Sequence, residues 1–399
     1  MGALGPPFKH FNMKNLYAIL LLCVWWIQSP CQDPISIDIV EIIQCKEEPV
    51  LSLFADTVSY IKLATQENCL IGRISQVAQI DDMIVISDRT SNRIFVFNDK
   101  GEFKNNIGFV GKGPGEYINL LYGFVIDRKL KQVLINCASR HSILRFALDG
   151  TLIEEIKLDR AFTNIGFIND NIVAYTSSSL TPLSNNYLIE VIDRKGTNKG
   201  VFHKYKVKRN ALEHMATVYN FGQNLRYWEK PFDAVFEFDG KTYRKHFEIE
   251  FGKFKMPEEF FYDIKTLNRE FKKYLILQSL TEFANFIYLT VFINNPPGVK
   301  KYFYYPGSGV TYCSSFKKES RSWGIENDIT GGPPFSFEFK VSENAVCCAY
   351  EVADLLEYKR LGINPPKKIK SPEGNNHLLN IIESSSINDN PILQIVKLK

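Results

Sequence analysis

The chain has 399 residues, of which 45% are apolar, 23% charged and 13% aromatic, a composition typical of a globular protein. Its formal charge is +4, and two of its lysines lie in an N-terminal segment that we expect to be removed, so the mature surface is nearly balanced. Proteins that bind nucleic acids usually carry a strong basic excess or a basic stripe. The densest basic run, residues 203–209, is interpreted as a solvated loop between strands. We therefore expect no nucleic-acid partner.

The N-terminus has the features of a secretory signal peptide. An apolar run at residues 16–27 is too short to span a bilayer comfortably, and a polar segment follows it. Met13 is a more natural start than Met1, because it places Lys14 directly before the apolar run, although the sequence leaves translation from Met1 open. We assign residues 1–30 to the signal peptide.

Cys31 lies directly after this segment, where a lipoprotein peptidase would leave a new N-terminal cysteine for acylation. The bacterial lipobox prefers leucine three places before the cysteine and small residues next to it. Here Gln28, Ser29 and Pro30 precede Cys31, and Pro30 departs most from that pattern. Two interpretations stay open, a lipid anchor on Cys31, which we favour, and an ordinary secreted protein. Residues 31–55 are expected to form a tether and a first strand.

A strand–turn pattern returns after 49 residues with its key positions in place. In the first copy, two apolar runs at residues 84–86 and 94–97 are followed by a turn with glycine at 99–101. The second copy has its apolar runs at 133–135 and 143–146 and its turn at 148–150. A looser third copy, of the second apolar run and the turn alone, lies at 189–196. A period in the forties with short strands and a hairpin marked by glycine is typical of a propeller blade. Residues 56–399 have room for six such blades, so we predict an all-β fold, a single six-bladed β-propeller.

Three later segments refine this prediction. Residues 257–274 begin with a proline and two acids and then place apolar residues three and four apart, which predicts a short helical insertion. Residues 274–293 are apolar, but Glu282 and two other polar residues interrupt them, so we expect two strands around a turn rather than a membrane span. The C-terminal strand, residues 391–399, is expected to pair with N-terminal strands and close the ring.

The glycine-rich stretch Gly111–Glu116 invites comparison with a phosphate-binding loop. Such a loop needs Ser or Thr after its lysine and a helix after the loop, so that backbone amides can hold the phosphates. No Ser or Thr follows Lys112, Pro114 removes a backbone donor, and strands are expected to follow. We interpret the stretch as a tight connection between blades, with glycines at positive φ.

No catalytic residue can be assigned from spacing. The acid pairs at residues 81–82, 154–155 and 258–259 are neighbours in sequence, and neighbours on a strand point to opposite faces, so they are poor pairs for glycoside hydrolysis. The sequence has no GxSxG elbow, no CxxC and no metal-ligand spacing among its six histidines. We therefore leave the catalytic residues unknown and expect neither a cofactor nor a metal.

The cysteines do not indicate a disulfide framework. Cys347 and Cys348 are adjacent, so on a strand their side chains point to opposite faces. We expect most of the cysteines to be small buried apolar filler. An exported location would allow one disulfide among four others, without indicating it: Cys45, Cys69, Cys137 and Cys313.

The segment Ile71–Tyr117, with Asp88 and Arg93 on its hairpin and its closing Gly-Lys-Gly-Pro-Gly-Glu-Tyr, resembles the six-bladed β-propeller proteins of Bacteroides-type bacteria, which look like relatives of the NHL propellers. The ending, Asn390-Pro391 followed by an alternating strand with basic residues, is similar to that family's C-terminus. The lipoprotein-like start is similar as well, so the resemblance covers nearly the whole chain. It implies an exported, often lipid-anchored propeller and carries no assigned catalytic residue.

From these observations we expect a monomeric binding or scaffold protein at the cell envelope, in the periplasm or on the outer membrane. The loop faces and central channel of a propeller form a ready concave site, so we expect a glycan, a peptide or an envelope protein as the partner. The alternative is a propeller hydrolase or lyase with acids and histidines at the channel mouth. The fold alone does not decide between the two. A cluster of His, Asp and Glu at the ring axis would favour the enzyme.

Overall fold

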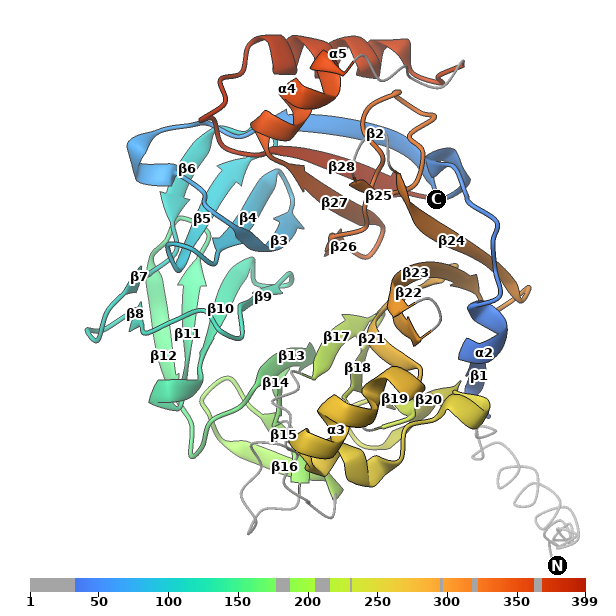
Figure 1. Ribbon diagram of the computed structural model, residues 1–399. Helices are drawn as coiled ribbons and strands as arrows, with labels where there is room; N and C mark the ends of the chain where they lie inside the picture. The colour runs from blue at the N-terminus through green and yellow to red at the C-terminus, as the bar shows by residue number, and fades with distance from the viewer. Residues whose placement is uncertain are drawn as a thin grey trace, which may run out of the picture.

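A computed structural model describes residues 33–176, 187–204, 216–229, 232–294, 297–317, 322–361 and 368–399. Within these ranges the strands form six sheets of four or five strands each, arranged around a central axis as the blades of a propeller (Figure 1). The predicted all-β fold with six blades is therefore confirmed. Figure 1 also shows that one strand of each sheet lies nearest the axis, and we call these the inner strands, because they form the wall of the central channel.

The first two blades correspond to the 49-residue repeat. The first blade consists of β3 (Ile74–Ile80), β4 (Met83–Asp88), β5 (Arg93–Asn98) and β6 (Phe103–Asn106). The second consists of β9 (Phe124–Asp127), β10 (Gln132–Cys137), β11 (Ser142–Ala147) and β12 (Leu152–Lys157). The two apolar runs of each repeat occupy the two middle strands. Between the blades, β7 (Phe109–Val110) and β8 (Glu116–Tyr117) form a short parallel pair.

The next three blades follow in chain order. The third contains β13 (Asn164–Ile168), β14 (Asn171–Tyr175), β15 (Tyr187–Ile192) and β16 (Asn198–Lys204). The fourth contains β17 (Thr217–Phe221), β18 (Asn224–Trp228), β19 (Ala234–Phe238) and β20 (Tyr243–Glu250). The fifth contains β21 (Ile276–Glu282), β22 (Ile287–Asn294), β23 (Pro297–Tyr305), β24 (Val310–Lys317) and β25 (Ser322–Gly324). Residues 274–293 thus form two strands around a turn, as predicted.

The sixth blade closes the ring with both ends of the chain. It contains β26 (Phe339–Ser342), β27 (Ala345–Tyr350), β28 (Ile392–Leu398) and, as its outer strand, β2 (Ala55–Lys62). The C-terminal strand β28 pairs with β27 on one side and with the N-terminal strand β2 on the other. This confirms the predicted closure, which leaves neither edge of β28 unpaired.

The apolar core lies between the blades. Each pair of neighbouring blades shares one cluster of buried apolar side chains, which makes six clusters around the described part of the ring. In β4, Val85 faces the second blade whereas Ile84 and Ile86 face the sixth. Because both faces of a middle strand are buried, its sequence is continuously apolar rather than alternating, which is why the repeat is visible in the sequence.

The glycine of the repeat is required by packing between blades. Gly101, Gly150 and Gly196 end the hairpins between the two outer strands of the first three blades, with φ values of 82°, 86° and 85°. A Cβ on Gly101 would lie 2.0 Å from the backbone oxygen of Lys62, and one on Gly150 would lie 2.5 Å from that of Asn106. Each hairpin tip therefore packs directly on the backbone of the preceding blade, where a side chain has no room.

The segment before β2, residues 33–54, runs along the outside of the ring, and we call it the N-terminal strap (Figure 1). Its strand β1 (Ile35–Asp38) adds to the outer edge of the fourth blade, parallel to β20. The short helix α2 (Ile39–Ile42) follows, and the Asp38 side chain caps it by accepting a hydrogen bond of 2.8 Å from the backbone N–H of Val40. Ile37, Ile39 and Ile42 are buried against the fourth and fifth blades.

The predicted helical insertion is present, and, besides the short helix α2, two longer helices were not predicted. The insertion consists of 3₁₀ turns at Glu258–Tyr262 and Phe271–Lys273 around α3 (Ile264–Glu270). These helices, α4 (Val352–Arg360) and α5 (Pro372–Glu383), follow β27 and precede β28 in the chain, and they pack on β2 (Figure 1). Among the described residues, no helix is long and apolar enough to cross a membrane.

Candidate functional site

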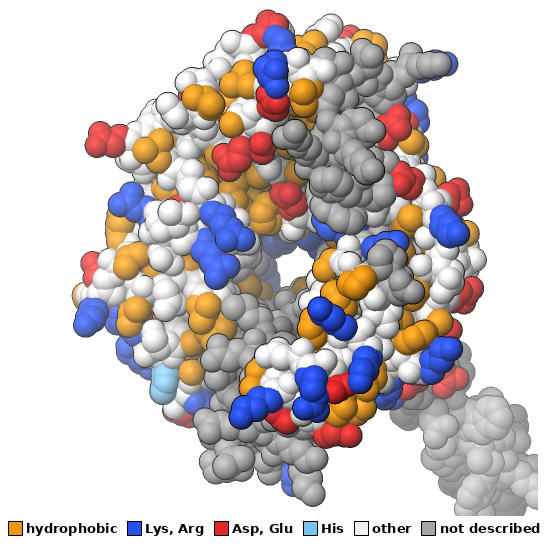
Figure 2. All heavy atoms as spheres, viewed as in Figure 1, with side chains coloured by type: hydrophobic (Ala, Val, Ile, Leu, Met, Phe, Trp, Pro, Cys, Tyr) orange, Lys and Arg blue, Asp and Glu red, His pale blue; other side chains and the backbone are white. Residues whose placement is uncertain are grey.

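The inner strands of five blades enclose a cavity of about 680 Å³ on the propeller axis, which we call the channel cavity. Its wall comes from β3, β9, β13, β17 and β26, and from the turns that follow four of these strands. Figure 2 shows an opening at the centre of the ring, with lysine and arginine side chains on its rim. A volume of this size lies in the range of ordinary small-molecule sites.

Two side-chain amides in the wall join neighbouring blades. Gln76 on β3 accepts a hydrogen bond from the backbone N–H of Phe124 at 3.1 Å and donates one to its carbonyl at 2.7 Å. Asn220 on β17 makes the same two contacts with Phe167 on β13: its oxygen accepts from the backbone N–H at 3.1 Å and its nitrogen donates to the carbonyl at 2.5 Å. These amides fix the spacing of the inner strands and give the cavity a rigid wall.

The charged groups of the wall are mostly paired within the protein. Arg128 donates to the backbone oxygens of Gln79, at 2.8 Å, and Val341, at 3.2 Å, so it joins the second blade to the first and the sixth. Lys129 pairs with Asp170 at the cavity rim. Asp127, which is almost fully buried, pairs with Arg194 at 2.6 Å. Lys129 and Asp127 thus have partners of opposite charge, whereas the hydrogen bonds of Arg128 are to carbonyl oxygens.

Lys340 on β26 is the cationic group most enclosed by the wall. Its Nζ donates to the backbone oxygen of Glu282 at 2.7 Å and lies 5.8, 5.4 and 5.2 Å from the ring centres of Tyr219, Phe221 and Phe283. Burial lowers the pKa of Lys340, and the negative charge of Glu282 opposes that shift. The ammonium group is thus held by aromatic faces and one carbonyl, between the fourth, fifth and sixth blades.

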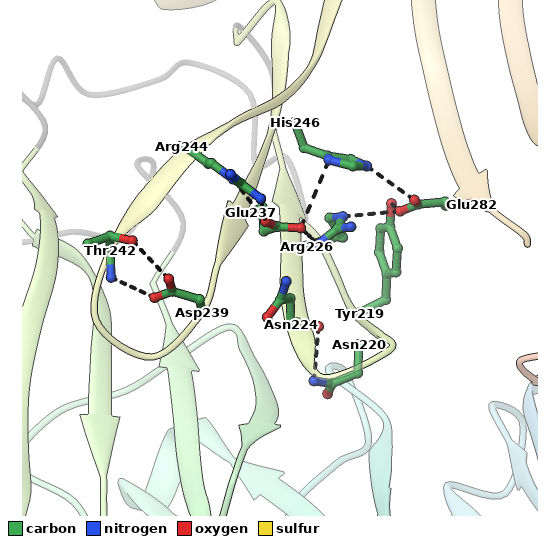
Figure 3. Close-up of polar contacts among 10 residues, drawn as sticks. All are labelled: Tyr219, Asn220, Asn224, Arg226, Glu237, Asp239, Thr242, Arg244, His246 and Glu282. Atoms are coloured by element: carbon green, nitrogen blue, oxygen red, sulfur yellow. Dashed lines mark hydrogen bonds and ion pairs between the residues drawn. The ribbon is translucent and has the colours of Figure 1, made fainter. Parts of the chain in front are cut away.

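A buried polar network leads from the cavity wall into the interface between the fourth and fifth blades (Figure 3). Tyr219, which lines the cavity, donates to Glu282 at 3.1 Å. Glu282 also pairs with Arg226 at 3.2 Å, and Arg226 pairs in turn with Glu237. We call Arg226, Glu237 and Glu282 the buried ion-pair triad. Each member is no more than 5% exposed.

Two further groups complete the network at its outer side. His246 on β20 lies 3.2 Å from Glu282 and 3.9 Å from Glu237, so its ring bridges the two carboxylates (Figure 3). Arg244 pairs with Glu237 at 2.7 Å, although its side chain is 47% exposed. Both carboxylates of the triad therefore have several donors.

The electrostatics of the network favour a structural role. Burial acts to raise the pKa of Glu237, but hydrogen bonds from Arg244 and the charge of Arg226 outweigh it, so the pKa of this carboxyl lies below its ordinary value. Burial, together with the Glu282 carboxylate, holds the pKa of Tyr219 well above its ordinary value. A carboxylate that is held ionised by a guanidinium group is a weak base, and a phenol that stays protonated is a weak acid. The network joins the fourth and fifth blades, and neither the Glu237 carboxylate nor the Tyr219 phenol has much acid–base capacity near neutral pH.

The structure places the residues singled out in the sequence away from the cavity. Asp81 and Asp82 lie in the β3–β4 hairpin, as expected, and Glu154 and Glu155 lie on the outer strand β12. Glu258 and Glu259 lie in a 3₁₀ turn of the helical insertion. None of these pairs lines the channel cavity. Among the described residues, no group of three or more His, Cys, Asp and Glu side chains is arranged to hold a metal ion.

The glycine-rich stretch connects the first and second blades, as predicted. The Glu116 carboxylate accepts a hydrogen bond of 2.6 Å from the backbone N–H of Gly113, so a side chain of the chain itself occupies the turn. Gly115 has a positive φ of 73°, whereas Gly111 and Gly113 do not adopt positive φ, so the expectation for the glycines holds for only part of the stretch.

Some predictions concern residues outside the ranges that the structure describes. Cys31, His214 and residues 205–209 of the basic run lie outside the described ranges. His203, at the start of that run, is not solvated as the interpretation required. It is buried, and a hydrogen bond of 2.8 Å joins its Nδ1 atom to the Tyr227 hydroxyl.

Sequence reasoning did not find Tyr219, Lys340 or the buried ion-pair triad. One signal was available, because Glu282 interrupts an otherwise apolar segment, and a lone acid there needs a buried partner. Tyr219, Lys340 and the members of the triad come from three blades, and no local spacing joins them.

The fold and the channel cavity define this protein as a six-bladed β-propeller with a cavity on its axis. Within that class, the chain belongs to the family described as "Domain of unknown function (DUF4934)", whose pattern matches residues 34–397.

Two solved structures from Bacteroides are similar to this chain. One is a protein of Bacteroides fragilis NCTC 9343 that is named as an inferred exported protein; it shares 18% identity and has a TM-score of 0.69, over 92% of this chain and 100% of the other. The second is a member of the DUF4221 family from Bacteroides vulgatus ATCC 8482, with 10% identity and a TM-score of 0.50, over 88% and 98% of the two chains. At these identities the likeness concerns the fold. No curated protein sequence matches the chain.

Proposed function

We propose that this protein is an exported binding or scaffold protein of the cell envelope, held there by a lipid on Cys31, and that its channel cavity binds a neutral polar ligand without chemical turnover. Among the ligand classes considered, a glycan, a peptide or an envelope protein, we favour the glycan. The NHL-like relationship and the monomeric state stay predictions.

The observation that carries this proposal is that most of the charged side chains of the channel cavity have partners within the protein. Lys129, Asp127 and Lys340 each have a partner within the protein, as described above. A strongly charged ligand would have to displace these contacts, whereas a neutral ligand would leave them intact. The wall also offers aromatic surface at Phe167 and Tyr219, which are partly exposed, and polar side chains at its rim. Aromatic faces combined with amides and hydroxyls suit the two faces of a sugar ring.

The contacts of the two buried acids behind Tyr219 favour binding without turnover. The two carboxylates behind Tyr219 are held by Arg226, and Glu237 in particular has a lowered pKa. A glycosidase needs one carboxyl that is protonated at working pH and a second that is free to act across the sugar. The buried ion-pair triad does not provide that combination, so we favour the binding protein over the hydrolase or lyase.

A combined binding and product assay tests the proposal. Purified residues 32–399 are screened against glycan and peptide libraries, and every hit is incubated and analysed for products. Saturable glycan binding without product is the expected result. A product whose formation depends on His141, His214 or His246 would favour the enzyme, and hits confined to peptides would assign the other ligand class.

A matched pair of variants places the ligand. Gln223 lies in the β17–β18 turn and lines the cavity, whereas Lys241 lies in the β19–β20 turn of the same blade and does not. Gln223→Trp is expected to weaken binding at least tenfold by filling the cavity mouth, and Lys241→Trp is expected to leave binding unchanged. Equal affinities for the two variants would place the ligand elsewhere.

The anchoring part of the proposal has its own test. The intact mass of full-length protein extracted from membranes should correspond to a chain that begins at Cys31 and carries two or three acyl chains. A soluble product without lipid would contradict the anchor and leave export standing.

A further inference from the structure

Cys45 in the N-terminal strap and Cys313 on β24 of the fifth blade lie side by side, although 268 positions separate them in the sequence. Their side chains pack against the same apolar cluster, which lies between the fourth and fifth blades. The Cys45 Sγ also lies 3.1 Å from the backbone oxygen of Thr311, and the backbone N–H of Cys313 donates to the oxygen of Glu47 at 2.8 Å. Several independent contacts therefore hold the two cysteines together.

The other described cysteines are less open to oxidation. Cys69, Cys137, Cys347 and Cys348 are buried, whereas Cys45 and Cys313 are both partly exposed. Both are thiols in this structure. Thiol–disulfide exchange requires access of a disulfide donor to an attacking thiolate, so this partly exposed pair is the one placed to react.

We propose that Cys45 and Cys313 form a disulfide that fastens the N-terminal strap to the fifth blade. The inference rests on the export included in the proposed function, because disulfides persist in oxidising compartments. The oxidant is a disulfide-bearing donor, such as an exported dithiol oxidase.

The exchange balances in two steps. The Cys45 thiolate attacks one sulfur of the donor disulfide and releases the first donor thiolate, which takes up a proton. Cys313 then loses its proton, its sulfur attacks Cys45 Sγ, and the second donor thiolate leaves. Two protein thiols are oxidised and the donor disulfide is reduced to two thiols. Burial, together with the neighbouring Cys45, raises the pKa of the Cys313 thiol to about 11, which disfavours Cys313 as the first nucleophile.

The position of this bond gives it a mechanical role. Cys45 lies between the proposed anchor at Cys31 and the ring-closing strand β2, so a pull on the anchor passes through the strap before it reaches β2. A covalent bond at Cys45 would transfer that load to the fifth blade. The hydrogen bonds between β2 and β28, which close the ring, would then be protected.

Peptide mapping tests the proposal in two arms. In the first, reduced residues 32–399, which contain the complete ring, are incubated with oxidised glutathione, alkylated and digested. We expect a linked peptide that joins Cys45 to Cys313, and a Tm about 5 °C above that of the reduced protein. Cys45→Ser is expected to give neither the link nor the rise in Tm. Cys313→Ser is expected to retain glutathione on Cys45, because the resolving thiol is missing.

The outcomes separate the disulfide from the export on which it rests. Wild-type protein that shows no link, or that keeps glutathione on Cys45, would overturn the disulfide itself, and this result does not depend on the folding of either variant. In the second arm, full-length protein is taken from the cell envelope with its thiols trapped at harvest. A link in the first arm together with free thiols in the second would contradict exposure to an oxidising compartment, and with it the proposed export.

Discussion

Removing Arg226 should destabilise the propeller strongly, because this side chain neutralises two buried carboxylates. Arg226→Met keeps the length and apolar stem of the side chain but leaves Glu237 and Glu282 without their shared cation. Breaking a buried ion pair from one side usually costs about 3–5 kcal/mol, since the remaining charge stays buried. For a chain of this size we expect the Tm to fall by about 4–6 °C.

Arg244→Met is the matched control. Arg244 pairs with the same Glu237, but its side chain is 47% exposed and the pair is solvated on one side. An exposed ion pair contributes about 0–1 kcal/mol, so the control should lower the Tm by no more than about 2 °C. Thermal unfolding followed by far-UV circular dichroism measures both variants. Equal losses in the two variants would refute the argument that burial makes the triad important.

The pH dependence gives a second check on the same variant. The pKa of Glu237 is lowered in the folded protein, so its contribution to stability is present above the ordinary value of 4.5 and is lost as the pH falls through the lowered value. Arg226→Met removes one cause of that lowering. The stability difference between wild type and variant should therefore be largest near pH 7 and shrink below about pH 4.5. A difference that does not change with pH would contradict the electrostatic origin.

Three other predictions concern the ring. Truncation after Asn390 removes β28 and unpairs both β2 and β27, so we expect loss of soluble folded protein; a truncated protein with the wild-type Tm would contradict closure through β28. Gly101→Ala places a Cβ against the Lys62 backbone at a positive φ, and urea unfolding should show a loss of at least about 2 kcal/mol. Burial lowers the pKa of His203 to about 4, so this histidine favours the folded state above about pH 6.5 and loses that contribution as the pH falls from 6.5 towards 4. Asparagine tolerates the positive φ at this position, so His203→Asn should keep the fold and reduce the change of the urea midpoint with pH between pH 5 and 6.5.

The fold was predictable from the sequence because its signals are local and repeated. The apolar runs of the middle strands and the hairpin glycines recur after 49 residues, and both follow from contacts between neighbouring blades. The helices α4 and α5 were missed. They form an insertion within the sixth blade, where the repeat signal has faded. The start signal of α5, the Ser371 cap followed by a proline, is present in the sequence but lies next to charged and polar residues that resemble a loop.

The candidate site was much less predictable. Tyr219, Glu282 and Lys340 come from the fourth, fifth and sixth blades, and they meet only because the ring brings the ends of their strands together. The amides of Gln76 and Asn220 look like ordinary polar residues on strands, and their bonds to the next inner strand depend on blade spacing. A single sequence records that such residues exist but not which of them face the axis.

Hydrogen exchange with and without a saturating glycan hit tests the central claim most directly, because it shows where the ligand lies. The account predicts added protection in the inner strands and the turns that follow them, at residues 124–129, 165–170, 218–223 and 340–343, with the outer strands β12 and β16 unchanged and the glycan recovered intact. Protection confined to the outer strands or to the helical insertion, or recovery of a cleaved glycan, would contradict it.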